Sequence, residues 1–487
     1  MAGKKTRPPI RVERLDDYRW RIPQTGRMLT EGIVYADDAL FARIRQDQSL
    51  EQVRNVACLP GIVGPSLAMP DIHWGYGFPI GGVAAFDPAE GIVSPGGVGY
   101  DINCGVRLLR SNLTRKEITP NLKAIADALF RDIPAGVGRG HKEYQLDPRE
   151  VRQVLEGGAA WAVEQGFGTE ADLDHIEEGG RLAGADAGEV SDRAVERGRR
   201  QLGTVGSGNH FIEVGYVAEI HDAAAASAFG LAKNHVTVFI HSGSRGLGYQ
   251  VCDDFISVML EASSRYGIDL PDRQLCCAPL RSPEGKRYLA AMSAAANFAF
   301  ANRQLMAHRV RETFRHTLGL TDRDLRMGLV YDVCHNIAKF ETHQVEGRSR
   351  RLCVHRKGAT RAFPGSAREV PADYRKVGQP VLIPGDMGRR SYVLAGAEGA
   401  LSATFGSACH GAGRVMSRNE ARRVARGREL VREFEERGIF LRGAGRATLV
   451  EEIPEAYKDV TEVVDVVEGA GLARKVAELR PLAVIKG

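Results

Sequence analysis

Five residues that can bind metal ions stand in short polar motifs that directly follow apolar segments of this 487-residue chain. They are Asp101 and Cys104 in GYDINCGVR, His210 in GSGNH, His241 in VTVFIHSGSR and His335 in GLVYDVCHN. Nitrogen and sulfur ligands suit zinc, iron or manganese better than calcium. A thiolate can bridge two cations, and a pair of ions about 3.5–4 Å apart can stabilise both oxygens of a phosphoryl transfer. The motifs therefore indicate a dinuclear metal site, although a single histidine is more often a hydrogen-bonded core or surface residue.

A further histidine, His410, lies in the motif HGAGR and could act as a nucleophile. The small residues after it leave room for a phosphorus atom, and glycine loops such as HGAGR and GSGNH can bring backbone amides to phosphates. Glycine loops alone are weak signals, because glycine mostly marks turns. The chain has neither the GxxxxGK[ST] motif of P-loop proteins nor the KxDG motif of ordinary ATP-dependent ligases. A lysyl-nucleotidyl intermediate of that kind is therefore not expected.

Short strands and tight turns are predicted to position these motifs. Residues 60–107 are rich in glycine and apolar residues, which is typical of short buried strands joined by turns. Further strands are predicted at 236–240, 328–333 and 381–383. Helices are predicted to begin at 119 and to span 284–318 and 418–437. Strands and helices alternate without a regular βαβ period. We therefore expect an α+β fold, a single large domain of complex mixed topology over residues 1–487, with 1–10 a flexible N-terminal tail.

The composition is that of a globular protein, with 43% hydrophobic and 26% charged residues. No apolar run approaches the roughly 18 residues of a membrane span, and the N-terminus lacks the apolar core of a secretory signal. Eight cysteines without CxxC spacing favour free thiols in a reducing compartment. We therefore expect a cytoplasmic protein with no membrane partner.

Arginine supplies 53 of the 66 basic residues, and the predicted helix at 418–437 carries a run of them. Arginine binds phosphate in a bidentate manner, which would suit a nucleic-acid partner. Arginine-favouring codon usage explains the excess equally well, and most charge runs are solvated faces. Charge alone therefore favours a polyanionic partner only weakly.

Taken together, the motifs resemble those of the RtcB family of tRNA-splicing and RNA-repair ligases. The similarity runs in order from about Ile33 to Gly487 and rests on MPDIHWGYGFPIGG, GYDINCGVR, GTVGSGNHFIEV, HSGSRGLG, AANFAFANRQ, CHN, PGDMG, HGAGR and the terminal VIKG. The resemblance implies an RtcB-like fold and a ligase that uses GTP and two Mn²⁺ ions. Its substrates would be RNA 2′,3′-cyclic phosphate or 3′-phosphate ends and RNA 5′-hydroxyl ends. It also implies a guanylyl-histidine intermediate and an RNA 3′ end activated with GMP.

Carried onto matching positions, the resemblance implies a role for each motif residue. The Mn²⁺ ligands would be Asp101, Cys104, His210, His241 and His335, with Cys104 shared between the ions, and His410 would be the nucleophile that takes GMP. The nucleotide pocket would be formed by Asn209, His210, Phe211, Ile212, Glu213, His335, Asn336, Pro384, Gly385, Asp386, Met387, Ser391, His410, Gly411, Ala412, Gly413 and Lys486. Asp71 in the PDIH motif matches a further position near the site, with a less defined role.

Four positions depart from the family pattern. Trp74 stands where glutamine is common, Asp386 where serine is common, and Arg389 and Arg390 where smaller residues are frequent. Asp386 would place a carboxylate near the nucleotide, on the guanine edge, which leaves the base preference open. None of the implied metal ligands is altered, nor is His410.

Two other functions stay open from the sequence. A dinuclear metal phosphoesterase that opens cyclic phosphates would explain the metal ligands but would leave His410 and Lys486 without a role. An inactive RNA-binding protein would be expected to have lost a ligand or His410, and none is lost. The physiological RNA, the metal loaded in the cell, the oligomeric state and the need for an activating partner such as archease are not determined by the sequence.

Overall fold

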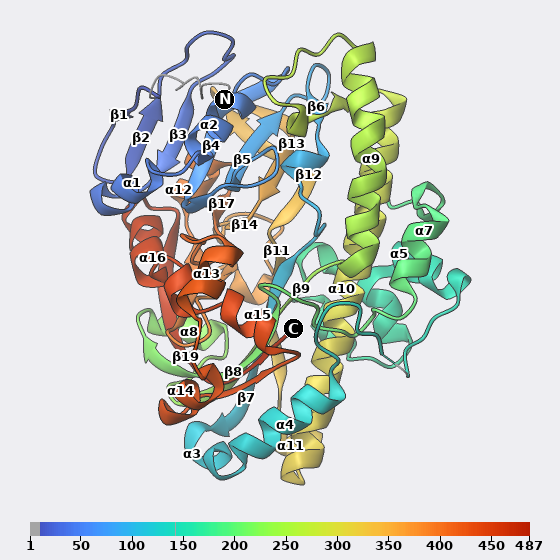
Figure 1. The fold of residues 1–487 in the computed structure, drawn as a ribbon, viewed down its shortest axis with the longest axis vertical. Coiled ribbons are helices and arrows are strands. Elements are labelled where there is room, and N and C mark those ends of the chain that lie inside the picture. The colour runs from blue at the N-terminus through green and yellow to red at the C-terminus, as the bar shows by residue number, and fades with distance from the viewer. Residues whose placement is uncertain (1–9, 142) are drawn as a thin grey trace.

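Two large β-sheets form the centre of the computed structural model, which describes residues 10–141 and 143–487 (Figure 1). The long helices α9 (Arg245–Arg265) and α10 (Pro283–Leu318) stand side by side along one flank of the sheets. The mixture of helices and sheets confirms the predicted α+β class. Of the predicted flexible tail at 1–10, all but Ile10 lies outside the described residues.

The first sheet has seven strands in the order β1-β2-β3-β4-β5-β13-β12. Its strands are β1 (Glu13–Arg14), β2 (Arg19–Ile22), β3 (Gly32–Tyr35), β4 (Ile62–His73), β5 (Ile80–Phe86), β12 (Asn336–Val345) and β13 (Arg348–Lys357). Only β3 and β4 pair in parallel. The register of β4 against β5 shifts between Ala68 and His73. Extra residues of β4 therefore bulge out of the ladder around Asp71, and a bulge of this kind redirects a side chain.

The second sheet follows the order β11-β7-β9-β8-β19-β16-β15, with β18 paired in parallel to β19. Its strands are β7 (Gly105–Thr114), β8 (Phe211–Ile220), β9 (His235–Ser242), β11 (Gly328–Cys334), β15 (Pro380–Ile383), β16 (Ser391–Gly396), β18 (Phe440–Gly443) and β19 (Ala473–Lys486). The register pairs Gly105 with both Cys334 and Ser242, and Phe211 with both His241 and Lys486. The polar motifs that begin or end these strands therefore meet where the ends of neighbouring strands lie side by side.

Two short pairs complete the strands: β6 (Ile92–Val93) with β10 (Ala278–Pro279), and β14 (Ala359–Arg361) with β17 (Ser407–Cys409). The second pair matters for the site, because β17 ends directly before His410. Its partner β14 follows Gly358, whose φ of 61° lies in the left-handed region, and a Cβ there would lie 2.3 Å from Ile80 and 3.1 Å from His410. Only glycine fits this turn beside His410.

The predicted strands at 236–240, 328–333 and 381–383 and the long helix at 284–318 are confirmed by β9, β11, β15 and α10. The other helices are α1 (Asp38–Ile44), α2 (Ser49–Val56), α3 (Arg115–Ile118), α4 (Leu122–Asp132), α5 (Pro148–Glu164), α6 (Glu170–Leu173), α7 (Asp192–Gly198), α8 (Ala223–Ala228), α11 (Asp322–Leu325), α12 (Glu398–Thr404), α13 (Arg418–Val424), α14 (Leu430–Glu436), α15 (Arg446–Glu451) and α16 (Val460–Gly469). α10 begins at the N-cap Ser282 and ends at the left-handed Gly319. Its alanine-rich middle is buried, which lets it pack closely against α5.

The single helix predicted at 418–437 is wrong, because the structure has two shorter helices, α13 and α14, separated by residues 425–429. Gly427 in this break has a φ of 82°, which a continuing helix cannot accommodate. Several arginines of this region pair with glutamates: Arg422 with Glu451, Arg428 with Glu433 at 2.7 Å, and Arg432 with Glu436 at 2.9 Å. Much of the arginine run is therefore balanced by neighbouring carboxylates.

Among the described residues, no helix has both the length and the apolar character needed to cross a bilayer. All eight cysteines are free thiols, as predicted, and seven of them are buried.

Candidate active site

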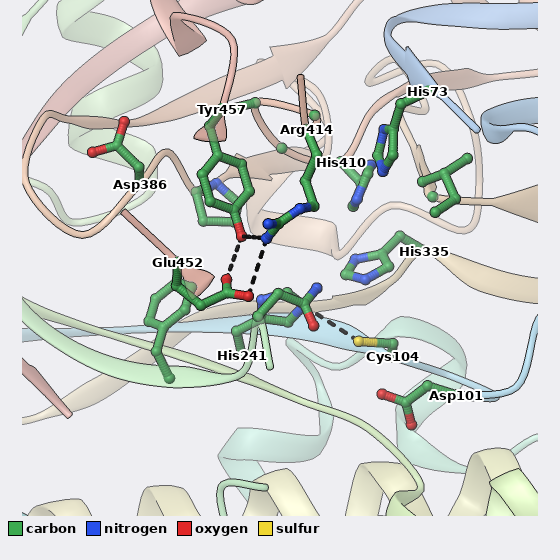
Figure 2. Close-up of a pocket in the computed structure, with 18 of the residues that line it drawn as sticks. His73, Asp101, Cys104, His241, His335, Asp386, His410, Arg414, Glu452 and Tyr457 are labelled. Atoms are coloured by element: carbon green, nitrogen blue, oxygen red, sulfur yellow. Dashed lines mark hydrogen bonds and ion pairs between the residues drawn. The ribbon is translucent and has the colours of Figure 1, made fainter. Parts of the chain in front are cut away.

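The strand ends of the second sheet and the residues around His410 enclose a cavity of about 340 Å³ (Figure 2). Most of the predicted site residues line it: Asp101, Cys104, Asn209, Phe211, Glu213, His241, His335, Asn336, Pro384, Gly385, Asp386, Met387, His410, Gly411, Ala412, Gly413 and Lys486. They come from segments that are far apart in the sequence. The register of the second sheet explains why Cys104, Phe211, His241, His335 and Lys486 meet.

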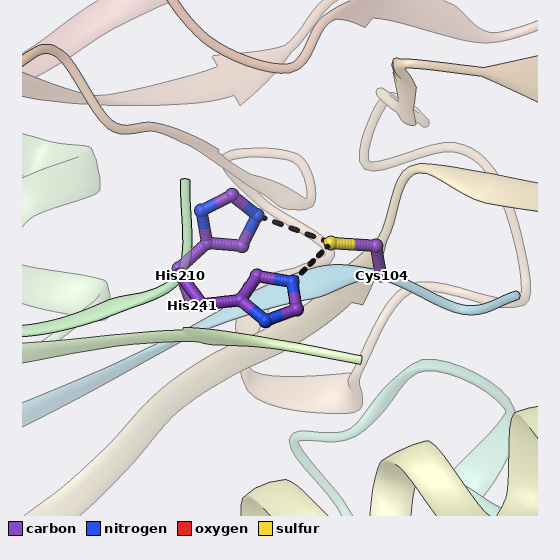
Figure 3. A group of neighbouring side chains, drawn as sticks. All are labelled: Cys104, His210 and His241. Carbon is purple, nitrogen blue, oxygen red and sulfur yellow. Dashed lines mark hydrogen bonds between the residues drawn. The ribbon is translucent and has the colours of Figure 1, made fainter. Parts of the chain in front are cut away.

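Cys104 lies at the centre of a compact group of possible metal ligands (Figure 3). Its Sγ is 3.3 Å from Nε2 of His210 and 3.3 Å from Nε2 of His241, and all three residues are buried. An oxygen of Asp101 lies 2.8 Å from the same nitrogen of His210. One carboxylate, one thiol and two imidazoles thus converge on a common point.

A tight turn brings Asp101 and Cys104 together. The backbone N–H of Cys104 donates to the carbonyl of Asp101, and Asn103 between them has a φ of 52°. Asparagine tolerates this left-handed conformation better than most residues. The buried guanidinium of Arg303 donates to both the backbone and the side-chain oxygen of Asn103, at 2.8 and 3.0 Å. Arg303 of α10 therefore holds the turn in place.

Burial raises the pKa of the Cys104 thiol well above its usual value, and the charge of Asp101 raises it further. A cation bound between these residues would stabilise the thiolate instead. Burial also lowers the pKa of His241 and His335 well below the usual range, so both rings are neutral and able to coordinate a metal.

His335 extends the group towards His410. Its ring centroid is 5.1 Å from that of His241 and 4.7 Å from that of His410. Its Nδ1 is buried and has no hydrogen-bond partner among the described residues. An unpaired buried nitrogen is costly unless it has a ligand. The donor set of sulfur, nitrogen and oxygen atoms therefore fits manganese or a similar transition metal.

His410 is held by Asp71, which the sequence had marked only as a position near the site. Oδ2 of Asp71 accepts from the His410 ring at Nδ1 (2.6 Å) and from its backbone N–H (3.0 Å). Asp71 is fully buried on the bulge of β4. Burial alone would raise the pKa of Asp71, but His410 and Lys458 outweigh it and hold the pKa below the usual value. Because an ionised carboxylate can only accept, Nδ1 carries the proton and Nε2 remains available to react.

The other end of the cavity contains Phe211, Glu213 and Lys486. Nζ of Lys486 lies 5.4 Å from the centroid of the Phe211 ring and 3.4 Å from Glu452. Glu213 accepts from the hydroxyl of Ser391 at 3.4 Å. Burial, with the charge of Asp386, raises the pKa of Glu213 to about 8, and Ser391 and Lys486 oppose part of this shift. This end can therefore present both hydrogen-bond acceptors and donors to a ligand.

Three predicted residues do not line the cavity. The Ile212 side chain belongs to the hydrophobic core on the other face of β8, since side chains alternate along a strand. Ser391 lies behind the wall and donates to Glu213, while also accepting from the Gly385 N–H at 3.1 Å. His210 contacts Cys104 and Asp101 directly, as described above.

Asp386 is committed to its own loop. One oxygen accepts from the backbone N–H of Gly388 (3.0 Å) and of Arg389 (3.2 Å), and the other pairs with the Arg389 guanidinium. Both oxygens of the Asp386 carboxylate therefore already have partners within the loop. The contact of this carboxylate with a guanine edge stays a prediction.

Several cavity residues were not expected from the sequence, notably Lys357, Arg414, Arg418, Glu452 and Tyr457. Figure 2 shows that Tyr457, Arg414 and Glu452 form a hydrogen-bonded triad on one wall. Arg414 closes the HGAGR motif and could have been noticed there. Glu452 and Tyr457 carry no motif, because only the tertiary fold brings them to the cavity.

Lys357 is buried and lines the same cavity. Its Nζ donates to the carbonyls of Tyr76, Phe78 (3.2 Å) and Gly96 (3.1 Å). Burial lowers the pKa of Lys357 to about 7. The lysine thus joins the loop between β4 and β5 to the 3₁₀ turn Pro95–Gly97 at the wall of the cavity.

The sequence was compared with protein families and with curated proteins. The family model described as tRNA-splicing ligase RtcB matches residues 52–487. The chain is 53% identical to the tRNA-splicing ligase RtcB of Thermococcus kodakarensis over 482 residues, which cover 99% of this chain and 100% of the relative. It is 54% identical to the tRNA-splicing ligase RtcB of Archaeoglobus fulgidus over 478 residues (98% and 99%). It is also 54% identical to the RNA-splicing ligase RtcB of Mycobacterium tuberculosis over 438 residues (90% and 100%).

Proposed function

The chain belongs to the RtcB family of tRNA-splicing ligases, and from that premise we propose that it joins RNA ends by way of a guanylylated His410. Its substrates are an RNA 2′,3′-cyclic phosphate or 3′-phosphate end and an RNA 5′-hydroxyl end, and GTP supplies the activating nucleotide. The observation that carries this proposal is the contact between Asp71 and His410. It leaves a reactive nitrogen free in a cavity that also contains Cys104, His241 and His335.

Two manganese ions would be held by Asp101, Cys104, His210, His241 and His335. When bound, they would neutralise charge on the phosphates and so favour displacement at phosphorus. The unpaired Nδ1 of His335 and the contacts of Cys104 with two imidazoles support this assignment.

In the first step, the lone pair of His410 Nε2 attacks the α-phosphorus of GTP. A phosphorus–nitrogen bond forms, the bond from the α-phosphorus to the bridging oxygen breaks, and pyrophosphate leaves. The ring becomes positively charged as this happens, and the Asp71 carboxylate stabilises that charge through Nδ1–H. The N–H groups of the residues that follow His410 in the HGAG turn lie beside the same cavity and can donate to phosphate oxygens.

Three displacements at phosphorus then complete the ligation of a cyclic end. A water molecule first opens a cyclic end to a 3′-phosphate. An oxygen of that 3′-phosphate attacks the phosphorus on His410, and the phosphorus–nitrogen bond breaks to give an RNA end capped with GMP. The 5′-hydroxyl of the second RNA attacks the RNA phosphorus, GMP leaves and the phosphodiester forms. Positioning and charge neutralisation dominate reactions of this type.

The guanine base would occupy the end of the cavity formed by Phe211, Glu213 and Lys486. Guanine presents N–H donors at N1 and N2 and an acceptor at O6. The carboxyl group of Glu213 and the ammonium of Lys486 complement these groups, and the ring of Phe211 offers a stacking face. The remaining nucleotide contacts would come from Asn209, Asn336 and the residues of the 384–387 and 410–413 loops, with His210 and Ser391 supporting them from outside the cavity lining. This arrangement supports GTP over ATP as the nucleotide.

We further propose that residues 1–487 act as one ligase domain in the cytoplasm, and that an activating protein such as archease assists turnover. Single turnover with and without added archease tests the last point.

The decisive experiment is covalent labelling. The purified protein is incubated with manganese and GTP labelled on the α-phosphate, then denatured. We expect acid-labile, alkali-stable label that is absent from His410→Ala and present in His316→Ala, a control at an exposed histidine near the end of α10. If no label forms although manganese is bound and archease is present, the protein is instead a phosphoesterase that opens cyclic ends.

A further inference from the structure

The segment Pro454–Asp459 contacts the backbone beside Asp71, the loop that follows His410, and Arg389 on the opposite wall of the cavity. It runs from the short 3₁₀ turn Pro454–Ala456 to the start of α16. Tyr457 lines the cavity, its hydroxyl contacts Glu452 and Arg414, and the Arg414 guanidinium lies 5.0 Å from the centre of its ring (Figure 2). The next residue, Lys458, contacts β4.

Lys458 is buried and binds the backbone on both sides of Asp71. Its Nζ donates to the carbonyl of Pro70 at 2.9 Å and to that of Ile72 at 2.7 Å. Its own backbone N–H donates to the carbonyl of Gly413 at 3.0 Å. Lys458 thus joins the bulge that carries Asp71 to the loop that carries His410.

A buried ammonium is costly unless its interactions compensate. Burial lowers the pKa of Lys458 to about 8, and the nearby charge of Asp71 opposes this shift. In return, Lys458 helps to lower the pKa of Asp71. The lysine therefore acts on the position of Asp71 and on its charge.

Arg389 fixes the other side of the same segment. Its guanidinium pairs with Asp386 and donates to the carbonyls of Pro454 (2.7 Å) and Tyr457 (3.2 Å). It also lies 3.7 Å from Asp459. Asp386 belongs to the loop between β15 and β16, which forms a wall of the cavity through Pro384, Gly385 and Met387. The planar fork of arginine suits such simultaneous contacts.

We propose that Lys458 and Arg389 are positioning residues, and that they make Pro454–Asp459 a strap between the nucleophile and the nucleotide wall. The kinetic consequences of this inference rest on the proposed function, because they concern guanylylation of His410. Lys458 holds Asp71 in place and ionised, and so keeps the His410 proton on Nδ1. Arg389 holds the wall formed by Tyr457 and the 384–390 loop in the shape that receives the nucleotide.

The two residues should affect different kinetic constants of guanylylation. Lys458→Met should lower kcat by roughly 10–100-fold while the KM for GTP stays within about threefold, because it disturbs the nucleophile and not the pocket. It should also move the acid limb of the rate profile to higher pH, since Asp71 loses a neighbouring cation and its pKa rises. Arg389→Ala should raise the KM for GTP by about tenfold and leave kcat within about threefold.

Matched variants make the test sharper. Arg390→Ala is the control for Arg389, because Arg390 pairs with Glu478 on β19 at 3.2 Å and does not line the cavity. Its KM for GTP should equal that of the parent protein. Asp386→Asn keeps an oxygen for the turn amides but removes the charge that pairs with Arg389, so it should raise KM in the same direction by less. GTP affinity measured in the His410→Ala background should show the Arg389 effect without any chemistry.

The proposal fails if Lys458→Met leaves kcat and the acid limb unchanged, or if Arg389→Ala changes GTP binding no more than Arg390→Ala does. Hydrogen exchange provides a readout that does not depend on ligation. Peptides that cover residues 454–459 should exchange faster in Arg389→Ala and Lys458→Met than in Arg390→Ala, and equal exchange would overturn the strap. If the parent protein takes no label from GTP, the proposed function fails, whereas the exchange result still decides whether the strap exists.

Discussion

The two walls of the cavity are built in different ways. The wall with the proposed metal ligands consists of the ends of neighbouring strands, so the register of one sheet fixes the relative positions of Cys104, His241 and His335. The wall with Arg414, Glu452 and Tyr457 consists of loops and short helices, which buried ionic and hydrogen-bond contacts hold in place. Local motifs therefore suffice to find the first wall, while the second depends on contacts between distant segments.

The largest effect is expected on the strand-built wall. Cys104→Ala removes the only sulfur of the proposed ligand group and should lower ligation by at least ~10³-fold, because the two proposed ions would lose the ligand that they share. Elemental analysis after dialysis should find less manganese per chain than in the parent protein. Full retention of the metal would show that Cys104 is not a ligand.

The next effect concerns the junction of the two walls. Asp71→Asn should keep the shape of the site but allow the His410 proton to sit on the wrong nitrogen, which should lower guanylylation by about 10²–10⁴-fold. The rate of label incorporation from GTP measures this. A rate within a factor of three of the parent would mean that Asp71 serves the fold alone.

A stability experiment asks how rigidly the strand-built wall is supported. Asp332 is fully buried and pairs with Arg107 at 2.7 Å and with Arg303 at 2.8 Å. Asp332→Ala leaves two buried guanidinium groups without their carboxylate and should cost about 3–5 kcal/mol. Urea unfolding of the metal-free protein measures the loss. Glu436→Ala, which breaks an exposed pair with Arg432, is the control and should cost about 1 kcal/mol or less.

The smallest effect is a pH dependence of the free energy of unfolding, which arises from Glu213 at the end of the cavity that also contains Phe211 and Lys486. The pKa of Glu213 is raised from 4.5 to about 8, so between these values the folded protein keeps a proton that the unfolded chain has released. Stability should therefore fall as the pH rises through this window. Glu213→Gln should flatten this part of the profile, as urea midpoints at several pH values would reveal. If the midpoints of Glu213→Gln depended on pH as those of the parent protein do, a group other than Glu213 would be responsible for the pH dependence.

The sequence predicted several strands well, and it also identified the motifs that the structure gathers at one cavity, because both are local patterns. Apolar runs such as 236–240 indicate buried strands, and the residues that follow them become the edge of the sheet. The predicted helix at 418–437 failed at Gly427, whose left-handed backbone interrupts a helical pattern of side chains. The sequence could not predict the contact of Asp71 with His410, because the bulge that carries Asp71 depends on the pairing of β4 with β5. The buried Lys458 and the ion pair of Asp386 with Arg389 depend likewise on segments that meet only in the folded chain.

The place of β19 in its sheet has a consequence for synthesis on the ribosome. β19 pairs with β8 on one side and with β16 on the other, and it begins roughly 250 residues after β8 ends. At about 5–20 residues per second, one edge of β8 stays unpaired for roughly 10–50 seconds after it is made. An unpaired edge strand is a template for aggregation. The nascent chain should therefore depend on chaperones during this interval, and cleavage before β19 emerges would leave the second sheet open at its centre.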